Sequence, residues 1–404
     1  LRIINPTMNN NIKDILNMPF INNAIFSPCV ECLVQHNISI SKQDWDSFET
    51  SWDFVTHPFI TYRSGAGFAD IPMNKWQYRI ADAYHTWESN ATAQFDLLKK
   101  NEEELNRIFI DIYGLQEELT PDVADKDVTV YRIIDEPSDE ERKMRYVLSM
   151  RDEIVSLLSY IVGCILGRYS PYVDGLLFAG GEWDDARIRA RIEEGAKACD
   201  FADPSLGLFY PDSDGIVPIT DEAYFPDDIA ERTVEFIRKV YGAETLEENL
   251  AFVASALGGR GETPREVIRN YYLNDFYADH LKTYQKRPIY WLCDSGKAGA
   301  FRALFYLHRY DRDTVGRIRM DYVHELQDRL RVQLDDARRA QESGEGRAKA
   351  QAGKRAQKLE KQLIELGQYE EQVHHLADMR IPLDLDDGVK VNYAKLGAIL
   401  GKIK

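Results

Sequence analysis

A basic stretch in the second half of the chain carries the side chains best suited to binding chemistry. It runs from Lys286 to Arg319 and reads KRPIYWLCDSGKAGAFRALFYLHRYDRDTVGRIR. Arginine and lysine neutralise phosphates and release condensed counterions, and arginine can also bind the edge of guanine with two parallel hydrogen bonds. The residue types therefore predict a contact with DNA, through six cations that follow the apolar run of this stretch: Lys297, Arg302, Arg309, Arg312, Arg317 and Arg319.

A solvated helix face is the simpler interpretation of these charges, because most isolated runs of cations form one. The charge distribution of the chain favours binding instead. The formal net charge is −17, yet residues 281–361 hold 19 Lys and Arg against 11 Asp and Glu, a net charge of +8. The other residues therefore carry −25, and residues 182–248 alone hold 18 acids and seven bases. We expect any DNA contact to be local and to avoid this acidic centre.

The elements that position the six cations are predicted from hydrophobic periodicity. The apolar run Pro288–Cys293 ends at Asp294-Ser295-Gly296, which predicts a buried central strand and a turn. The apolar residues after the turn repeat at near-helical spacing, which predicts a helix with one packed side and one cationic side (Phe301, Leu304, Phe305 and Leu307).

Long helices are predicted on both sides of this stretch. An apolar stripe predicts one long helix or a broken pair of helices from Asn74 to Tyr113, which Gly114 ends, and a second long helix is expected from about Ser138 to Gly167. The residues Ile154–Leu166 within the second are apolar but fall short of the ~20 residues that span a bilayer. We therefore expect a core helix and no membrane partner.

Two further helices follow the basic stretch, at Asp321–Ala340 and Arg347–Asp378. Their apolar residues fall at a and d positions of a heptad repeat, with Glu370 as the exception, and predict an antiparallel pair. After them, Asp387-Gly388 is expected to turn the chain into a last strand. The predicted fold class is α+β and mostly α, with a mixed α/β region, long helices and an antiparallel coiled-coil-like helical hairpin.

Two short motifs resemble metal sites without completing one. Cys29 and Cys32 form a lone CxxC with His36 nearby, but no second pair follows, so two small buried side chains on one helix face are favoured. The residues 212–215, DSDG, resemble the start of a calcium loop that lacks its later ligands. A hairpin turn between strands at 207–210 and 216–219 is favoured.

The remaining residues indicate an ordinary folded protein of a reducing compartment. Five cysteines without regular spacing fit the cytoplasm better than a disulfide framework, and the first residues lack the pattern of a secretion signal. The start at Leu1 leads us to expect a piece of a longer protein. Trp45, Phe48 and Trp52 recur at helical spacing and are predicted to lie in a core.

Several long segments resemble one family, and they occur in the same order along nearly the whole chain. They are INPTMNNNIKDILNMPF, DWDSFETSWDF, NEEELNRIFIDIYGL, PDSDGIVPITDEAYFPDD, the basic stretch and LDDGVKVNYAKLGAILGKIK. Together they resemble the C-terminal half of the adenine-specific DNA methyltransferases of BREX phage-defence systems, the PglX family. The resemblance implies a target-recognition region followed by a helical module, in an enzyme that methylates N6 of adenine.

The chain departs from this family where catalysis is concerned. The resemblance implies S-adenosylmethionine for the intact parent enzyme, held by a Gly-rich loop, and an Asn-Pro-Pro-Tyr type motif for the flipped adenine. The sequence holds neither: Asn5-Pro6-Thr7 and Asp203-Pro204-Ser205 lack the second proline and the aromatic residue, and the glycines at 63–67 follow no convincing strand. We predict no catalytic residue, metal or cofactor in this chain.

Three functions are therefore compared. The favoured one is a DNA target-recognition half that binds double-stranded DNA and works with the methyltransferase domain of its parent protein. The second is a protein-interaction module that docks other defence-system proteins. The third is a free-standing enzyme such as a nuclease, for which no carboxylate metal site is evident. The predicted domains are an N-terminal connector (1–135), an α/β target-recognition region (136–310), and a helical hairpin with a C-terminal tail (311–404).

Overall fold

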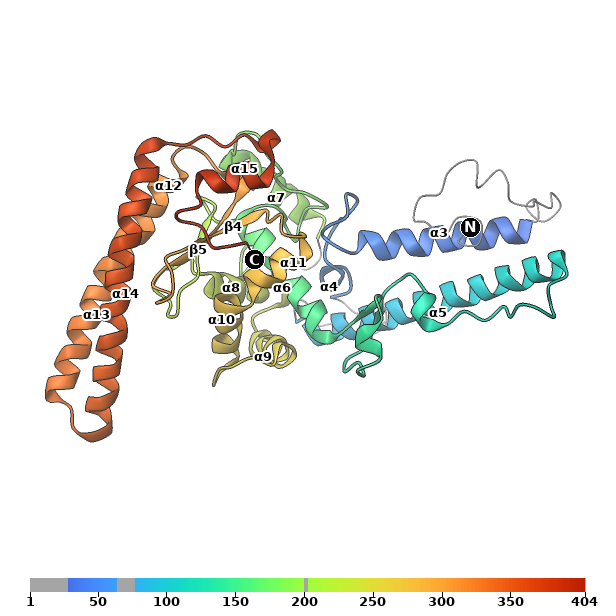
Figure 1. Ribbon diagram of the computed structural model, residues 1–404, viewed down its shortest axis with the longest axis horizontal. Helices are drawn as coiled ribbons and strands as arrows, with labels where there is room; N and C mark the ends of the chain where they lie inside the picture. The colour runs from blue at the N-terminus through green and yellow to red at the C-terminus, as the bar shows by residue number, and fades with distance from the viewer. Residues whose placement is uncertain (1–27, 64–76, 200–202, 404) are drawn as a thin grey trace. The chain divides into compact units, whose positions relative to one another are not determined.

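The computed structural model describes residues 28–63, 77–199 and 203–403 (Figure 1). Two compact units can be distinguished along the chain. The first comprises residues up to Trp45, Ser89–Ile133 and Pro137–Val147, and the second holds the rest. The motifs considered at 5–7 and 64–67 lie outside the described residues.

The first unit is built on two helices, and its core joins Ile40 of one to Phe95 and Leu98 of the other, together with Val128 and Val130. The long helix predicted from residue 74 is confirmed as α5, and Gly114 ends it with a φ of +68°. The elements are α3 (Pro28–Asp46), α5 (Ile80–Tyr113, from Ser89 on), η1 (Asp125–Asp127), β1 (Arg132–Ile133), η2 (Glu141–Lys143) and β2 (Val147–Leu148), the last at the border of the unit.

The second unit contains most of the helices and a three-stranded sheet. Its helices before the sheet's last two strands are α4 (Pro58–Thr61), α6 (Met150–Leu166), α7 (Asp185–Lys197), α8 (Ile229–Tyr241), α9 (Leu246–Leu257), α10 (Pro264–Asn274) and α11 (Phe276–Thr283). The strands are β3 (Ile216–Pro218), β4 (Tyr290–Asp294) and β5 (Arg302–Tyr306). The helices that follow are η3 (Leu307–Arg309), α12 (Thr314–Arg317), the π-helical η4 (Ile318–Val323), α13 (His324–Ser343), α14 (Gly346–Met379), η5 (Leu385–Asp387) and α15 (Gly388–Lys395).

Helix α6 is the core helix of the second unit, as expected. Ser149 caps it, because its hydroxyl accepts from the Asp152 backbone while the Asp152 carboxylate accepts from the Ser149 backbone. Gly167 ends it in the left-handed conformation. The predicted start at Ser138 is wrong, because residues 141–148 form η2 and β2 before this cap.

The sheet has the order β3-β5-β4 and is antiparallel throughout. The predicted strand at Pro288–Cys293 is confirmed as β4. Side chains alternate between the two faces of a strand, so Trp291, Cys293, Ala303 and Phe305 share one face and belong to the core that the helical hairpin completes.

The helix predicted after the turn is wrong, because those residues form β5, the central strand of the sheet. All of Ala303–Tyr306 are buried, since the strand is covered on both faces. A continuously apolar run fits a buried strand and a buried helix equally well, and periodicity does not separate the two. In the structure these residues form a strand, because Phe305 pairs with Trp291 of β4 and Ala303 pairs with Cys293.

The antiparallel helical hairpin is confirmed as α13 and α14, which lie side by side in Figure 1. The apolar a and d residues form its seam, with Leu330 on α13 and Leu359, Leu366 and Val373 on α14 all buried. The exceptional Glu370 is explained by two polar neighbours, because Arg319 and His324 both contact its carboxylate.

Two other expectations in the second unit are wrong. The described chain after residue 387 forms α15 in place of a strand, and Leu400 makes an isolated bridge to Cys293. The segment 207–210 forms no strand, and β3 pairs with β5 instead. The DSDG turn is held by its own carboxylates, because Asp212 accepts from the backbone of Gly215 and Asp214 from that of Ile216.

The predicted burial of two N-terminal motifs is also wrong. Cys29 and Cys32 lie on α3 as expected, but both are exposed. Trp45 is 62% exposed and Trp52 102% exposed, so neither belongs to a core among the described residues. The helical spacing of the tryptophans does not persist, because α3 ends at Asp46.

The fold class is confirmed as α+β and mostly α. Within the described ranges, no helix is both long and apolar enough to cross a membrane. The three-domain division, with borders at 135 and 310, stays a prediction.

Candidate nucleic-acid interface

The turn between β4 and β5, residues 295–301, presents Lys297 to solvent. Its base is tied by the Asp294 carboxylate, which accepts from the backbone of Gly296 and lies 3.4 Å from Nε of Arg302. Arg302 also donates to the carbonyl of Leu273. Arg302 therefore stabilises the start of the turn through Asp294, and Lys297 is the exposed cation of the turn.

Glu365 of α14 holds the same turn from the side. Its carboxylate accepts hydrogen bonds from the Ser295 hydroxyl and from the backbone N–H groups of Ala298 and Ala300, at 2.8, 2.6 and 3.1 Å. A Cβ at Gly296 would lie 2.9 Å from this carboxylate, at a φ of +133° that L side chains rarely adopt. The turn is therefore fixed to the hairpin, and a bulkier residue at position 296 would disturb it.

Arg309 is buried and forms part of the protein's interior. Its guanidinium donates to the carbonyls of Leu166, Asp212 and Ser213, and it lies 3.5 Å from the centre of the Trp183 ring. Burial lowers its pKa to about 10, which leaves it charged at neutral pH. Its hydrogen bonds satisfy three carbonyls, so its evident role is structural.

The last three cations follow β5 and η3. Arg312 is exposed and has no ion-pair partner among the described residues. Arg317 donates to both oxygens of Asp311 at 3.0 Å, and Arg319 lies 2.6 Å from the carboxylate of Glu370. Lys297 and Arg312 are thus the two of the six predicted residues that combine exposure with the lack of a described carboxylate partner.

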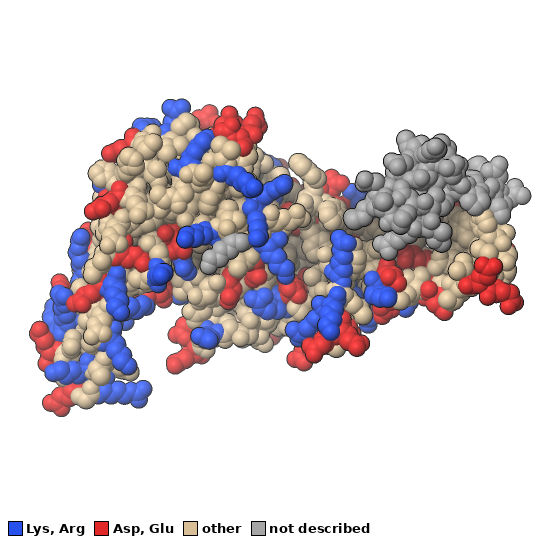
Figure 2. Space-filling view, in the orientation of Figure 1, with Lys and Arg blue, Asp and Glu red and all other residues tan. Residues whose placement is uncertain are grey.

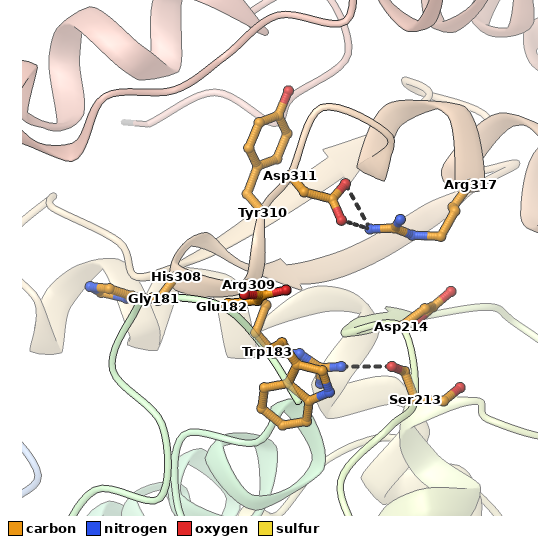
Figure 3. A pocket seen from close by; sticks show the side chains of 10 residues that line it. All are labelled: Gly181, Glu182, Trp183, Ser213, Asp214, His308, Arg309, Tyr310, Asp311 and Arg317. Atoms are coloured by element: carbon orange, nitrogen blue, oxygen red, sulfur yellow. Dashed lines mark hydrogen bonds and ion pairs between the residues drawn. The ribbon is translucent and has the colours of Figure 1, made fainter. Parts of the chain in front are cut away.

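A cavity of about 500 Å³ lies beside the segment that carries Arg312 (Figure 3). Its lining combines the stacked Trp183 and Arg309 with the ion pair of Asp311 and Arg317. His308 also lines it, and burial lowers the pKa of this imidazole, so the neutral form is favoured. The lining is polar and holds both arginines and acids, among them Glu182 and Asp214, which suits a hydrogen-bonding ligand.

A carboxylate cluster lies close to this cavity. The Tyr322 hydroxyl is 3.1 Å from Asp214 and 2.8 Å from Asp227, and Asp212 is buried beside them. Burial and the neighbouring Asp214 raise the pKa of Asp212 to about 8. No group of three His, Cys, Asp or Glu side chains within the described ranges could hold a metal ion. Asp212 and Asp214 accept hydrogen bonds from the backbone of residues 215 and 216, so the cluster supports this turn.

Sequence reasoning missed Glu365 and Trp183. Glu365 lies 67 residues beyond the turn that it holds, and its position on the helix looks like any surface acid. Trp183 is in the acidic centre, and only the fold brings its ring onto Arg309. Neither carries a local motif that could have indicated its partner.

The described residues thus contain two exposed cations and a polar cavity on a mixed α and β scaffold. Comparison with known proteins shows which sequences this chain resembles. No family model matches the chain. It is 40% identical over 402 residues to the adenine-specific methyltransferase PglX of Lacticaseibacillus casei (strain Zhang), an alignment with 98% of this chain and 30% of that protein. It is 35% identical over 412 residues to the adenine-specific methyltransferase BrxX of Escherichia coli O9:H4 (strain HS), across 100% of this chain and 32% of that protein.

The chain is similar along nearly its whole length to one part of these adenine-specific methyltransferases, and the resemblance to the PglX family predicted from its sequence is confirmed. It spans about a third of the length of these relatives. The activity of the whole proteins therefore does not pass to this chain by similarity alone.

Proposed function

We propose that this chain is the DNA target-recognition part of an adenine-specific DNA methyltransferase that serves phage defence. The observation that carries the proposal is the pair of exposed cations, Lys297 and Arg312, on the two connections of the central strand β5. Both connections are held by side chains of the folded core, so the cations are presented at defined places. The similarity to proteins named adenine-specific methyltransferases supports DNA as the partner.

The six predicted cations divide into three kinds in this proposal. Lys297 and Arg312 contact DNA. Arg317 and Arg319 are half-buried and form ion pairs with Asp311 and Glu370. In this proposal they contribute in one of two ways: they leave these carboxylates to bind phosphates, or they keep the ion pairs and orient the segment that carries Arg312. Arg302 and Arg309 position the interface from within, because both donate to backbone carbonyls and Arg302 also forms an ion pair with Asp294.

The methyl donor and the catalytic residues belong, in this proposal, to the rest of the parent enzyme. S-adenosylmethionine is the donor expected there, because the sequence of this chain holds neither the Gly-rich loop nor the Asn-Pro-Pro-Tyr type motif. The recognition part would select the DNA and orient it toward the catalytic domain. Phosphate contacts set the register, and contacts to base edges give the sequence preference.

The proposal is tested in the intact parent enzyme with the double variant Lys297→Gln and Arg312→Gln. A matched control removes two exposed cations of the first unit, Lys126→Gln and Lys143→Gln. Binding to a DNA duplex is measured from about 50 to 200 mM salt, where phosphate contacts change affinity steeply. We expect the first variant to bind more weakly, with a log–log salt slope reduced by about 0.9 per lost phosphate contact, and the control to bind like the parent.

Equal binding by parent, variant and control would contradict the proposal. It would favour the protein-interaction module instead, in which this surface docks another defence protein.

A further inference from the structure

The first half of α14 has a charge pattern that the rest of the hairpin lacks. Residues 346–361 contain six Lys and Arg and a single acid, Glu360. Figure 2 shows Lys and Arg side chains gathered on the part of the hairpin nearest its turn, with acids among them. Within the part of the chain that the structure describes, some of these cations form ion pairs with neighbouring acids and others do not.

The four arginines of α13 are all paired. Arg329 binds Glu325, Arg331 binds Asp328 and Arg339 binds Asp336, each within one turn of the helix, while Arg338 reaches Glu360 of α14. Such pairs are what a solvated helix face usually contains. Helix α13 is therefore locally balanced in charge.

Helix α14 differs because three of its cations lie on one face without a described acidic partner. They are Arg347, Lys354 and Lys361, spaced seven residues apart and all exposed. By contrast, Arg355 and Lys358 on the same helix are bound to Glu222 and Asp221. Seven residues are two turns, so the three side chains point in nearly the same direction, about 10 Å apart along the axis.

We propose that Arg347, Lys354 and Lys361 form a second DNA contact, a stripe along the hairpin that binds phosphates independently of sequence. The inference rests on the proposed function and extends it to a surface outside the basic stretch. The spacing of about 10 Å is close to the ~12 Å width of the major groove, so successive cations of the stripe can reach phosphates on either side of it. A duplex is the partner that fits, because its charge is periodic and negative while the stripe is periodic and positive.

The test is the triple variant Arg347→Gln, Lys354→Gln and Lys361→Gln in the intact parent enzyme. The matched control is Arg329→Gln, Arg331→Gln and Arg339→Gln, which removes the same charge from the same hairpin but from paired positions. Binding to target and non-target duplexes is measured over the same salt range. We expect the α14 variant to lower the magnitude of the salt slope by up to about 2.7, at about 0.9 per phosphate, and the α13 control to lower it much less.

Two further readouts make the result specific. Phosphate contacts carry no sequence information, so the ratio of target to non-target affinity should stay that of the parent. A charge-conserving variant, Arg347→Lys with Lys354→Arg and Lys361→Arg, should restore binding and shows whether the Gln variant lost charge or folding.

Equal effects of the two triple variants, or no effect of either, overturn the stripe. The stripe is also overturned if the α14 triple variant binds DNA as the parent does but no longer binds an acidic partner protein. These results are distinct from failure of the proposed function, since in that case the Lys297 and Arg312 variant also binds DNA as the parent does.

Discussion

Glu365 accepts a hydrogen bond from the backbone of Ala298, with 2.6 Å between its Oε2 and the amide nitrogen, although the two residues are 67 positions apart. Through this contact the helical hairpin holds the β4–β5 turn, and Lys297 is the exposed residue within it. The helical hairpin and the proposed recognition turn are therefore directly hydrogen-bonded to each other within the second unit.

The variant Glu365→Gln tests this contact. The amide keeps one acceptor oxygen but places an NH₂ group against backbone donors, so at least one hydrogen bond is lost. We expect a loss of about 1–3 kcal/mol in the free energy of unfolding, measured by chemical denaturation. Glu371→Gln is the control, because Glu371 is exposed on the same helix and has no ion-pair partner among the described residues. Equal stability of the two variants would show that Glu365 does not hold the turn.

The seam of the hairpin is tested by Leu359→Asp. Leu359 is 3% exposed, and a carboxylate there would be buried without a partner. We expect a lower melting temperature and a loss of helical circular dichroism. Ile364→Asp serves as the control, since Ile364 is on the same helix but 65% exposed. The seam is wrongly assigned if both variants melt at the parent's temperature.

The buried carboxylate cluster predicts a dependence of stability on pH. Burial and the nearby Asp214 raise the pKa of Asp212 from 3.8 to about 8, so the folded state holds this proton more tightly than the unfolded state. For an acid with a raised pKa, stability falls as pH rises through the window between the two values. The groups around it are Asp214, Asp227, Tyr322 and Arg309.

The variant Asp212→Asn should remove most of this dependence. An asparagine oxygen can still accept from the backbone of Asp214 and Gly215, while the charge cannot form. We expect the variant to gain stability relative to the parent between pH 5 and pH 8, as measured by thermal unfolding in a pH series. A constant difference between variant and parent over that range would mean that Asp212 does not titrate in this window.

The sequence predicted the elements whose signals are local. The long α5, the strand β4 and the hairpin follow from periodicity. Gly114 ends α5 as expected of a glycine, and a and d residues such as Leu359 are buried in the hairpin seam. The strand β5 was mistaken for a helix because its residues are apolar on both faces, and only the pairing of Phe305 with Trp291 distinguishes the two.

The sequence indicated the region of the candidate site, the basic stretch 286–319, but not which of its cations face solvent. Six cations were indicated by charge, but burial separates them: Arg309 is enclosed by carbonyls and Trp183, while Lys297 and Arg312 face solvent. These partners come from distant parts of the chain, so no spacing along the sequence indicates them. The same holds for Glu365.

The central claim, that this chain selects the DNA sequence to be methylated, is tested most directly by exchange. A hybrid is made in which this chain replaces the matching third of the Lacticaseibacillus casei relative, and the positions of N6-methyladenine are mapped by sequencing the DNA of a host that carries it. We predict that the hybrid methylates the sequence marked by the parent of this chain, and that the Lys297→Gln and Arg312→Gln hybrid methylates less of it. Methylation at the relative's own sequence, unchanged by the exchange, would contradict the account.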